Sequence, residues 1–194
     1  MKIIEFSNAQ IVTIIVALLG GELDHIDRED IAIKADELAH GKFNWRKYPN
    51  KIDLNTVTVA LNDAKKARNG NLIVGNNQRG WMLSDNGLKW LLSLSQLNNL
   101  EDLHVDSLVK KILDSLQIEI ERLLATQAHI KQISGEADSI TERDFFEFTR
   151  TNEYFKIKAK ERRYTIIQNA VSNYPALKIT WNTLKQKFLK ENKK

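Results

Sequence analysis

Apolar residues at helical spacing predict three helices in the first third of the chain: one over residues 8–19, one from the acidic run that begins at Asp27 to near Gly41, and one over residues 54–66. In each segment apolar side chains recur at steps of three and four, so one face of the helix is buried. A Gly-Gly pair after residue 19 is a helix stop signal. Asp53 is suited to cap the start of the third helix.

A β-hairpin is expected after the third helix. Two short apolar runs, residues 72–74 and 81–83, flank a polar tip at residues 75–80, whose terminal glycines permit a tight turn. A further short strand and a loop are expected from Phe43, where aromatic residues alternate until Pro49 bars a regular continuation.

The rest of the chain is predicted to be helical. Ser84 or Asp85 is suited to cap a fourth helix. One long amphipathic helix is expected over residues 103–133, with a break near 117–119 as the alternative. Shorter helices are expected from Ser139 onward, over residues 153–171 and over residues 180–188.

The order helix, helix, strand, helix, strand, hairpin tip, strand, helix over about residues 8–96 resembles the winged-helix fold, a relative of the helix-turn-helix with a two-stranded wing. The resemblance rests on element order and on the glycine-framed wing. It implies a winged-helix domain at 1–98, and the helical periodicity of the rest predicts an all-helical dimerisation or docking domain at 99–194, so the fold class is mainly α. The insertion at residues 43–52 is longer than a tight helix-turn-helix turn.

Composition narrows the class of protein. With 42% hydrophobic and 28% charged residues the chain is typical of a globular protein. It has no cysteine, which excludes disulfides and Cys-ligated metals and fits a reducing cytoplasm. The apolar run at residues 11–19 is too short to span a bilayer and lacks the flanks of a signal peptide. We therefore expect a cytoplasmic protein with no membrane contact.

Charge alternates in blocks along the chain. The net charge is −5 for residues 1–41, +6 for 42–79, −6 for 80–149 and +9 for 150–194. A local positive field attracts phosphates, so the two basic blocks indicate an anionic partner. In the second block the cations recur along predicted helices and would bind nucleic acid or the acidic segment of a second copy: Lys156, Lys158, Lys160, Arg162, Arg163, Lys185, Lys187 and Lys190.

No catalytic motif stands out. The four histidines lack metal-site spacing, and phosphate-binding and nucleophile-elbow motifs are absent. Two carboxylate clusters are candidates for acid/base chemistry, residues 24–30 around His25 and the pair Asp144 and Glu147. A solvated helix start and a polar helix face explain them better. We expect no enzyme activity and no cofactor.

The winged-helix resemblance implies contact with double-stranded DNA, with the third helix in the major groove and the wing on phosphates or the minor groove. Cations on the third helix occur only at its C-terminal end, so contacts to the DNA backbone are expected rather than base reading. The candidate residues surround this helix and the wing: Arg46, Lys47, Lys51, Asn55, Thr56, Asn62, Lys65, Lys66, Arg68, Asn76, Asn77, Gln78 and Arg79.

Two further features have alternative interpretations. Trp45, Trp81 and Trp90 are interpreted as core anchors rather than a base-stacking platform. The segment 103–133 either packs on the chain's own C-terminal helices or binds a partner, as a homodimer or on a larger subunit.

The leading functional hypothesis is a non-catalytic DNA-associating regulator or accessory subunit of a larger bacterial assembly. The alternative is a protein-binding adapter of a chromosome-maintenance or anti-phage defence complex.

Overall fold

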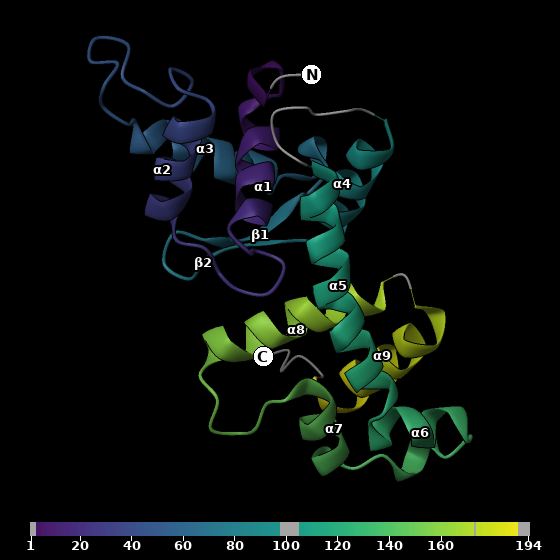
Figure 1. Cartoon of the computed structure of the whole chain (residues 1–194). Helices are drawn as coiled ribbons and strands as arrows, with labels where there is room; N and C mark the ends of the chain where they lie inside the picture. Colours follow the sequence, from purple (N-terminus) through teal and green to yellow (C-terminus); the bar gives the residue numbers. More distant parts are fainter. Residues whose placement is uncertain (1–2, 98–104, 173, 190–194) are drawn as a thin grey trace. The chain divides into compact units, whose positions relative to one another are not determined.

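The computed structural model describes residues 3–97, 105–172 and 174–189, and it is mainly helical with one small antiparallel hairpin, as predicted (Figure 1). The chain forms two compact units, Met1–Leu113 and Asp114–Lys194. The division falls within a helix, whereas the boundary predicted at residue 98 lies outside the described residues. None of the helices in the described ranges combines the length and apolarity needed to cross a bilayer.

The first unit is organised around its most apolar helix. This helix, α1 (Asn8–Leu18), packs against α2 (Arg28–Leu38), α3 (Leu54–Ala64) and the hairpin (Figure 1). Every side chain over residues 11–17 is buried, because α1 is apolar on nearly all sides. The unit also contains α4 (Asp85–Leu97) and the first part of α5 (Val105–Leu124).

The hairpin pairs β1 (Ile73–Asn76) with β2 (Gly80–Leu83). Both predicted glycines are required there, because Gly75 and Gly80 have φ of 129° and 87°. A Cβ on Gly75 would lie 2.1 Å from the carbonyl oxygen of Gly80. The hairpin prediction is therefore confirmed, although the strands extend further into the tip than the predicted apolar runs.

A third chain segment extends the hairpin at Ile26, between α1 and α2. The Ile26 N–H donates to the Trp81 carbonyl and the Trp81 N–H donates to the Ile26 carbonyl, both at 2.9 Å. The strand predicted from Phe43 is wrong, since the structure has only an isolated bridge between Asn44 and Ile52. Phe43 is buried, and the chain then turns outward instead of extending a sheet.

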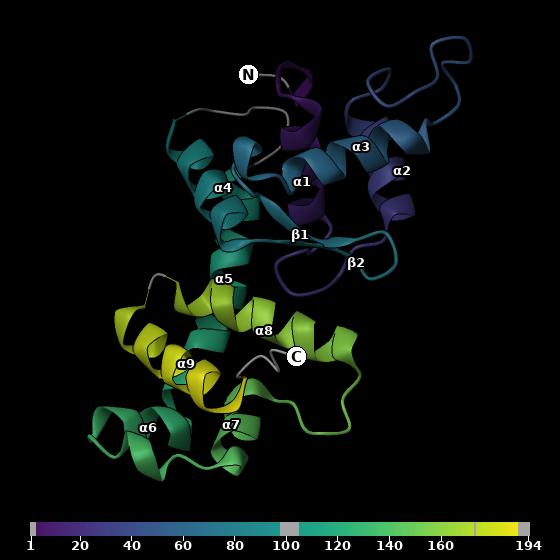
Figure 2. The same ribbon diagram turned by 180° about the vertical axis from the view of Figure 1, so that it is seen from behind.

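The second unit has a core rich in aromatic side chains. Its helices after α5 are α6 (Gln127–Ile133), α7 (Glu142–Thr149), α8 (Ile157–Val171) and α9 (Pro175–Phe188), visible from behind in Figure 2. The rings of Phe148 and Trp181 stack with centroids 6.1 Å apart, and Phe145 lies 5.2 Å from Phe188. These contacts join α7 to α9.

A buried ion network joins three helices of this unit. One carboxylate oxygen of Glu119 accepts from Arg122 and Arg163, each at 2.6 Å. Arg122 also donates to the Phe148 carbonyl and Arg163 to the Thr149 carbonyl, at the C-terminal end of α7. The buried guanidinium groups thus find their hydrogen-bond partners in the Glu119 carboxylate and in the last carbonyls of α7, away from water.

Helix boundaries in the second half differ from the prediction. The single helix over 103–133 is wrong, and so is the alternative break at 117–119, since α5 ends at Leu124 and α6 starts at Gln127. Thr126 takes an extended conformation there, and its hydroxyl donates to the Leu123 carbonyl at 2.7 Å. Residues 103 and 104 lie outside the described residues.

Two other predicted helices start at different residues. The helix expected over 153–171 begins at Ile157, because residues 152–155 form a turn. The helix expected over 180–188 begins at Pro175, which occupies the first turn of α9, where a missing N–H costs nothing.

Candidate nucleic-acid interface

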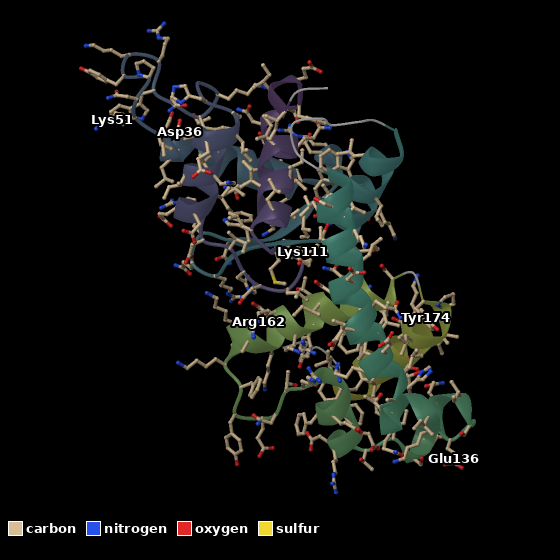
Figure 3. All side chains as sticks on the ribbon, in the orientation of Figure 1. Asp36, Lys51, Lys111, Glu136, Arg162 and Tyr174 are labelled. Atoms are coloured by element: carbon tan, nitrogen blue, oxygen red, sulfur yellow. The ribbon has the colours of Figure 1, made fainter. Side chains whose placement is uncertain are left out.

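A loop between α2 and α3 projects from the first unit and carries exposed cations of the basic segment. We call residues 45–51 the first aromatic–basic loop; Lys51 marks it in Figure 3. The loop is held by its own backbone, since the Trp45 N–H donates to the Lys51 carbonyl and the Lys51 N–H to the Tyr48 carbonyl, both at 2.9 Å. The conformation of the loop is therefore fixed by backbone hydrogen bonds rather than by burial of its side chains.

Two aromatic rings of this loop face solvent. Trp45 and Tyr48 are each 50% exposed, and their ring centroids lie 6.3 Å apart. The interpretation of Trp45 as a core anchor is therefore wrong, because the chain leaves the core after Phe43. Trp81 is buried as expected, while Trp90 is half-buried and meets the Phe6 ring edge-on at 6.2 Å.

The cations of the loop form no ion pair with any residue that the structure describes. Arg46, Lys47 and Lys51 are exposed, and no carboxylate of the described residues lies within ion-pair distance of them. The Lys47 ammonium lies 5.5 Å from the centre of the Tyr48 ring. Their positive charge can therefore act on an external anion.

Asp53 lies where the loop meets α3. Its carboxylate accepts from the Thr56 hydroxyl at 2.8 Å and from the Asn55 N–H at 3.0 Å, which caps the helix. The Thr56 hydroxyl, more than any other group, lowers the pKa of Asp53, and the Trp45 side chain adds to this effect. The ionised carboxylate thus stabilises the start of α3.

Along α3 itself, most of the predicted polar contacts are made within the protein. Thr56 is bound to Asp53, and the Asn62 amide donates to the Thr58 carbonyl at 2.9 Å. Asn55 is exposed and offers its side chain to solvent. The helix therefore presents few groups for reading base edges.

The three cations after α3 are also engaged. Asp63 pairs with Lys66 at 2.7 Å and with Arg68 at 3.3 Å. Lys65 donates to the carbonyl of Gly75 at 2.9 Å, which ties the end of α3 to the hairpin. These side chains are exposed, so their pairs are weak and exchange readily with other anions.

At the tip of the hairpin, Asn76 stabilises the turn rather than pointing to a ligand. Its side-chain oxygen accepts from the N–H groups of Gln78 and Arg79, both at 3.0 Å. Asn77 and Gln78 are exposed, whereas Arg79 is half-buried and engaged in a contact. The hairpin tip thus presents two exposed polar side chains, Asn77 and Gln78.

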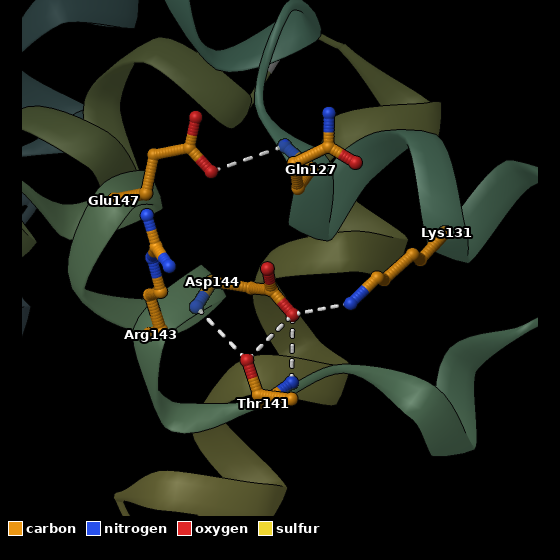
Figure 4. Close-up of a pocket in the computed structure, with 6 residues that line it drawn as sticks. All are labelled: Gln127, Lys131, Thr141, Arg143, Asp144 and Glu147. Atoms are coloured by element: carbon orange, nitrogen blue, oxygen red, sulfur yellow. Dashed lines mark hydrogen bonds and ion pairs between the residues drawn. The ribbon is translucent and has the colours of Figure 1, made fainter.

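The second unit contains a polar cavity of about 590 Å³, which includes the predicted carboxylate pair (Figure 4). Asp144 accepts from Lys131 at 2.7 Å and from the Thr141 N–H at 2.8 Å; these bonds outweigh burial and lower its pKa. Glu147 accepts instead from the Gln127 N–H at 3.3 Å. Each of these two carboxylates of α7 thus bonds to a residue of α6 and helps to hold the two helices together.

The other acidic cluster forms a helix start. Asp24 accepts from the adjacent His25 N–H, and Asp27 precedes α2. Across the described ranges, no three His, Asp or Glu side chains are arranged to hold a metal ion.

The aromatic residues of the loop are the part of the candidate site that the sequence prediction misses. That prediction places Trp45 in the core and gives Tyr48 no role, although the run Trp-Arg-Lys-Tyr interleaves rings with cations in a way typical of nucleic-acid contacts. Comparison with protein-family models, with curated proteins and with solved structures finds no match to this chain.

Proposed function

We propose that the protein associates with DNA without catalysing a reaction, chiefly through contacts to the phosphate backbone. The observation that carries the proposal is the exposed loop whose three cations, Arg46, Lys47 and Lys51, have no acidic partner in the described residues. Such cations release condensed counterions when they neutralise phosphates, which favours binding of any DNA sequence.

The arrangement around the loop supports a winged-helix module as the carrier of this function. The first unit runs α1, α2, α3 and hairpin, and Ile26 pairs with the returning strand. In DNA-binding proteins of this type the helix before the wing faces DNA. Because Asn62 and Thr56 bond within the protein, we expect contact without strong base preference.

Fluorescence anisotropy on a random duplex tests the proposal. The variant R46E/K47E/K51E removes the unpaired cations and should weaken binding at low salt by about tenfold or more. The slope of log affinity against log salt should fall by about 0.9 for each phosphate that the variant no longer neutralises. The matched control K110E/R143E/K178E changes the net charge equally at exposed cations outside the loop.

The two variants separate local contact from general charge. Equal weakening in both would contradict a specific role of the loop. Affinity for the duplex no better than for an uncharged polymer would contradict DNA binding altogether.

A second candidate function is docking of a protein partner through α5 and α6. Ile118 on α5 and Ile130 and Ile133 on α6 are exposed large apolar residues, and the last two are spaced to share a helix face. Size-exclusion chromatography with light scattering would detect a second copy. A strictly monomeric mass would exclude a homodimer at the concentration used.

A further inference from the structure

The second unit has a loop of the same chemical kind as the first aromatic–basic loop. We call residues 154–158, which follow α7 and lead into the first turn of α8, the second aromatic–basic loop (Figure 2). Tyr154 is 85% exposed and Ile157 68% exposed, and Phe155 is also open to solvent. The loop therefore presents an apolar surface that the unit leaves uncovered.

The second loop is also ordered by local hydrogen bonds, and its cations also have no ion pair within the described part of the chain. The Tyr154 N–H donates to the Asn152 side chain at 3.0 Å, and the Phe155 N–H donates to the Asn152 carbonyl at 3.3 Å. Lys156 and Lys158 are exposed, with no ion pair to a described carboxylate. These rings and cations are thus held on a structured turn.

Other cations of the C-terminal basic block are engaged within the unit. Arg163 is part of the Glu119 network, and Lys185 lies 5.5 Å from the Trp181 ring. Lys187 donates to the Asp138 carbonyl at 2.8 Å.

Three more of the eight cations named for this block also differ from the two loop lysines. Lys160 donates to the Glu153 carbonyl at 3.3 Å, Arg162 has a contact of its own, and Lys190 lies outside the described residues. Of the eight cations named for this block, Lys156 and Lys158 are therefore the ones that are exposed and have no ion pair among the described residues; Arg150 and Lys178 of the same block are also exposed but lie outside the loop.

Exposed rings next to unpaired cations match a ligand that has flat apolar faces at regular intervals along an anionic chain. Nucleic acid has this chemistry, but in a duplex each base face is covered by its neighbours. Only an unpaired strand can offer base faces to the exposed rings while its phosphates meet the lysines. The rings concerned are Trp45, Tyr48, Tyr154 and Phe155.

We propose that the two aromatic–basic loops are contact sites for single-stranded DNA, in which the rings stack on bases and the adjacent cations bind phosphates. This inference rests on the proposed DNA association and specifies its preferred ligand. It assigns the base contacts to loops rather than to α3 or the wing.

Anisotropy titrations with a labelled oligo(dT) strand and with a duplex of equal length test the proposal. The single strand should bind more tightly at moderate salt. The variants W45A/Y48A and Y154A/F155A should each lose about 5- to 150-fold in affinity for oligo(dT) per stacked ring. Duplex affinity should change by less than about threefold, because the cations remain.

The control variant Y174A removes an exposed aromatic side chain outside both loops, labelled in Figure 3. It should leave affinity for oligo(dT) unchanged. Folding of every variant is checked by circular dichroism, and none of the four loop rings is fully buried.

Tryptophan fluorescence gives a second readout that does not depend on affinity. Trp81 and Trp181 are buried and Trp90 is half-buried, so Trp45 is the most exposed described tryptophan. Oligo(dT) should quench emission of the natural protein, and W45F should abolish most quenching while retaining a ring for stacking. W90F should keep the quenching.

The outcomes separate this inference from the proposed function. If the duplex binds as tightly as oligo(dT), or if the ring variants bind oligo(dT) normally, the single-strand proposal is overturned while duplex association stands. Ring-dependent binding to phosphatidylserine vesicles without oligo(dT) binding would also overturn it. If the natural protein binds neither oligo(dT) nor the duplex better than an uncharged polymer, the proposed function itself fails.

Discussion

The two units differ in how their cores hold charge. In the first unit Glu22 is 2% exposed, and its Oε2 atom has no hydrogen-bond partner among the described residues; burial raises its pKa. In the second unit Glu119 is also buried, yet two arginines outweigh the burial and lower its pKa. Burial alone favours the protonated form of a carboxyl group, whereas two neighbouring arginines favour its ionised form.

The units resemble each other at their surfaces. Each presents a structured loop of exposed rings and of cations without an ion pair among the described residues, although the two cores are packed from different helices and side chains. A feature that recurs on two different cores does not follow from packing. This contrast is why we assign function to the loops and stability to the cores.

The largest expected effect comes from breaking the ion network of the second unit. Glu119→Leu leaves Arg122 and Arg163 buried without a carboxylate, which should cost about 3–5 kcal/mol of unfolding free energy. Glu121→Leu, at an exposed site on the same helix, should cost less than about 0.5 kcal/mol. Urea unfolding measures both, and equal values would contradict the buried role of Glu119.

The second-largest effect is expected from lowering the pH, which should destabilise the second unit because His129 is buried. Burial lowers the pKa of His129 below its ordinary value of 6.5, and its Nδ1 lies 2.9 Å from the Thr180 hydroxyl. The unfolded chain therefore gains a proton before the folded one does, so stability is complete above pH 6.5 and falls as pH drops toward the folded pKa.

Peptide-resolved hydrogen exchange between pH 7.5 and 5 measures this decrease in the second unit alone. His129→Gln should flatten the pH dependence in that window. A slope unchanged in this variant would assign the effect to another group.

A smaller effect of opposite sign is expected in the first unit. Because the folded pKa of Glu22 lies above 4.5, its contribution to stability is complete below pH 4.5 and is lost as pH rises through the folded pKa. Glu22→Gln should therefore gain stability relative to the natural protein on going from pH 4 to pH 7. Lys111 offsets part of the burial effect, so the gain should be modest. A constant difference across that range would contradict the raised pKa.

The smallest effect on stability is expected at the loops. W45A/Y48A and Y154A/F155A remove largely exposed rings, so each should change the free energy of unfolding by less than about 1 kcal/mol. Thermal unfolding of the same preparations used for oligo(dT) binding checks this. A loss as large as that of Glu119→Leu would place the rings in the cores and remove the basis of the comparison.

Much of the local structure could be predicted from residue patterns. The helix starts at Asn8, Arg28 and Leu54, and the hairpin between Gly75 and Gly80, follow from periodicity, caps and glycine conformations to within a few residues. The break at Thr126 was not predictable in this way, because the apolar stripe continues across it. It is imposed by packing of α6 on α7 and α9.

The features of the candidate site also fall into those that the sequence predicts and those that depend on the folded structure. The mainly helical class, the glycine-framed hairpin and the basic segment between α2 and α3 follow from the order of residues alone, since these features depend on backbone preferences and on charge count. Which polar groups form ion pairs depends on the folded arrangement, in which Lys47 is exposed and Lys66 pairs with Asp63. The folded arrangement also turns Trp45 outward, because burial depends on where the chain leaves the core, and spacing along the chain does not encode that point.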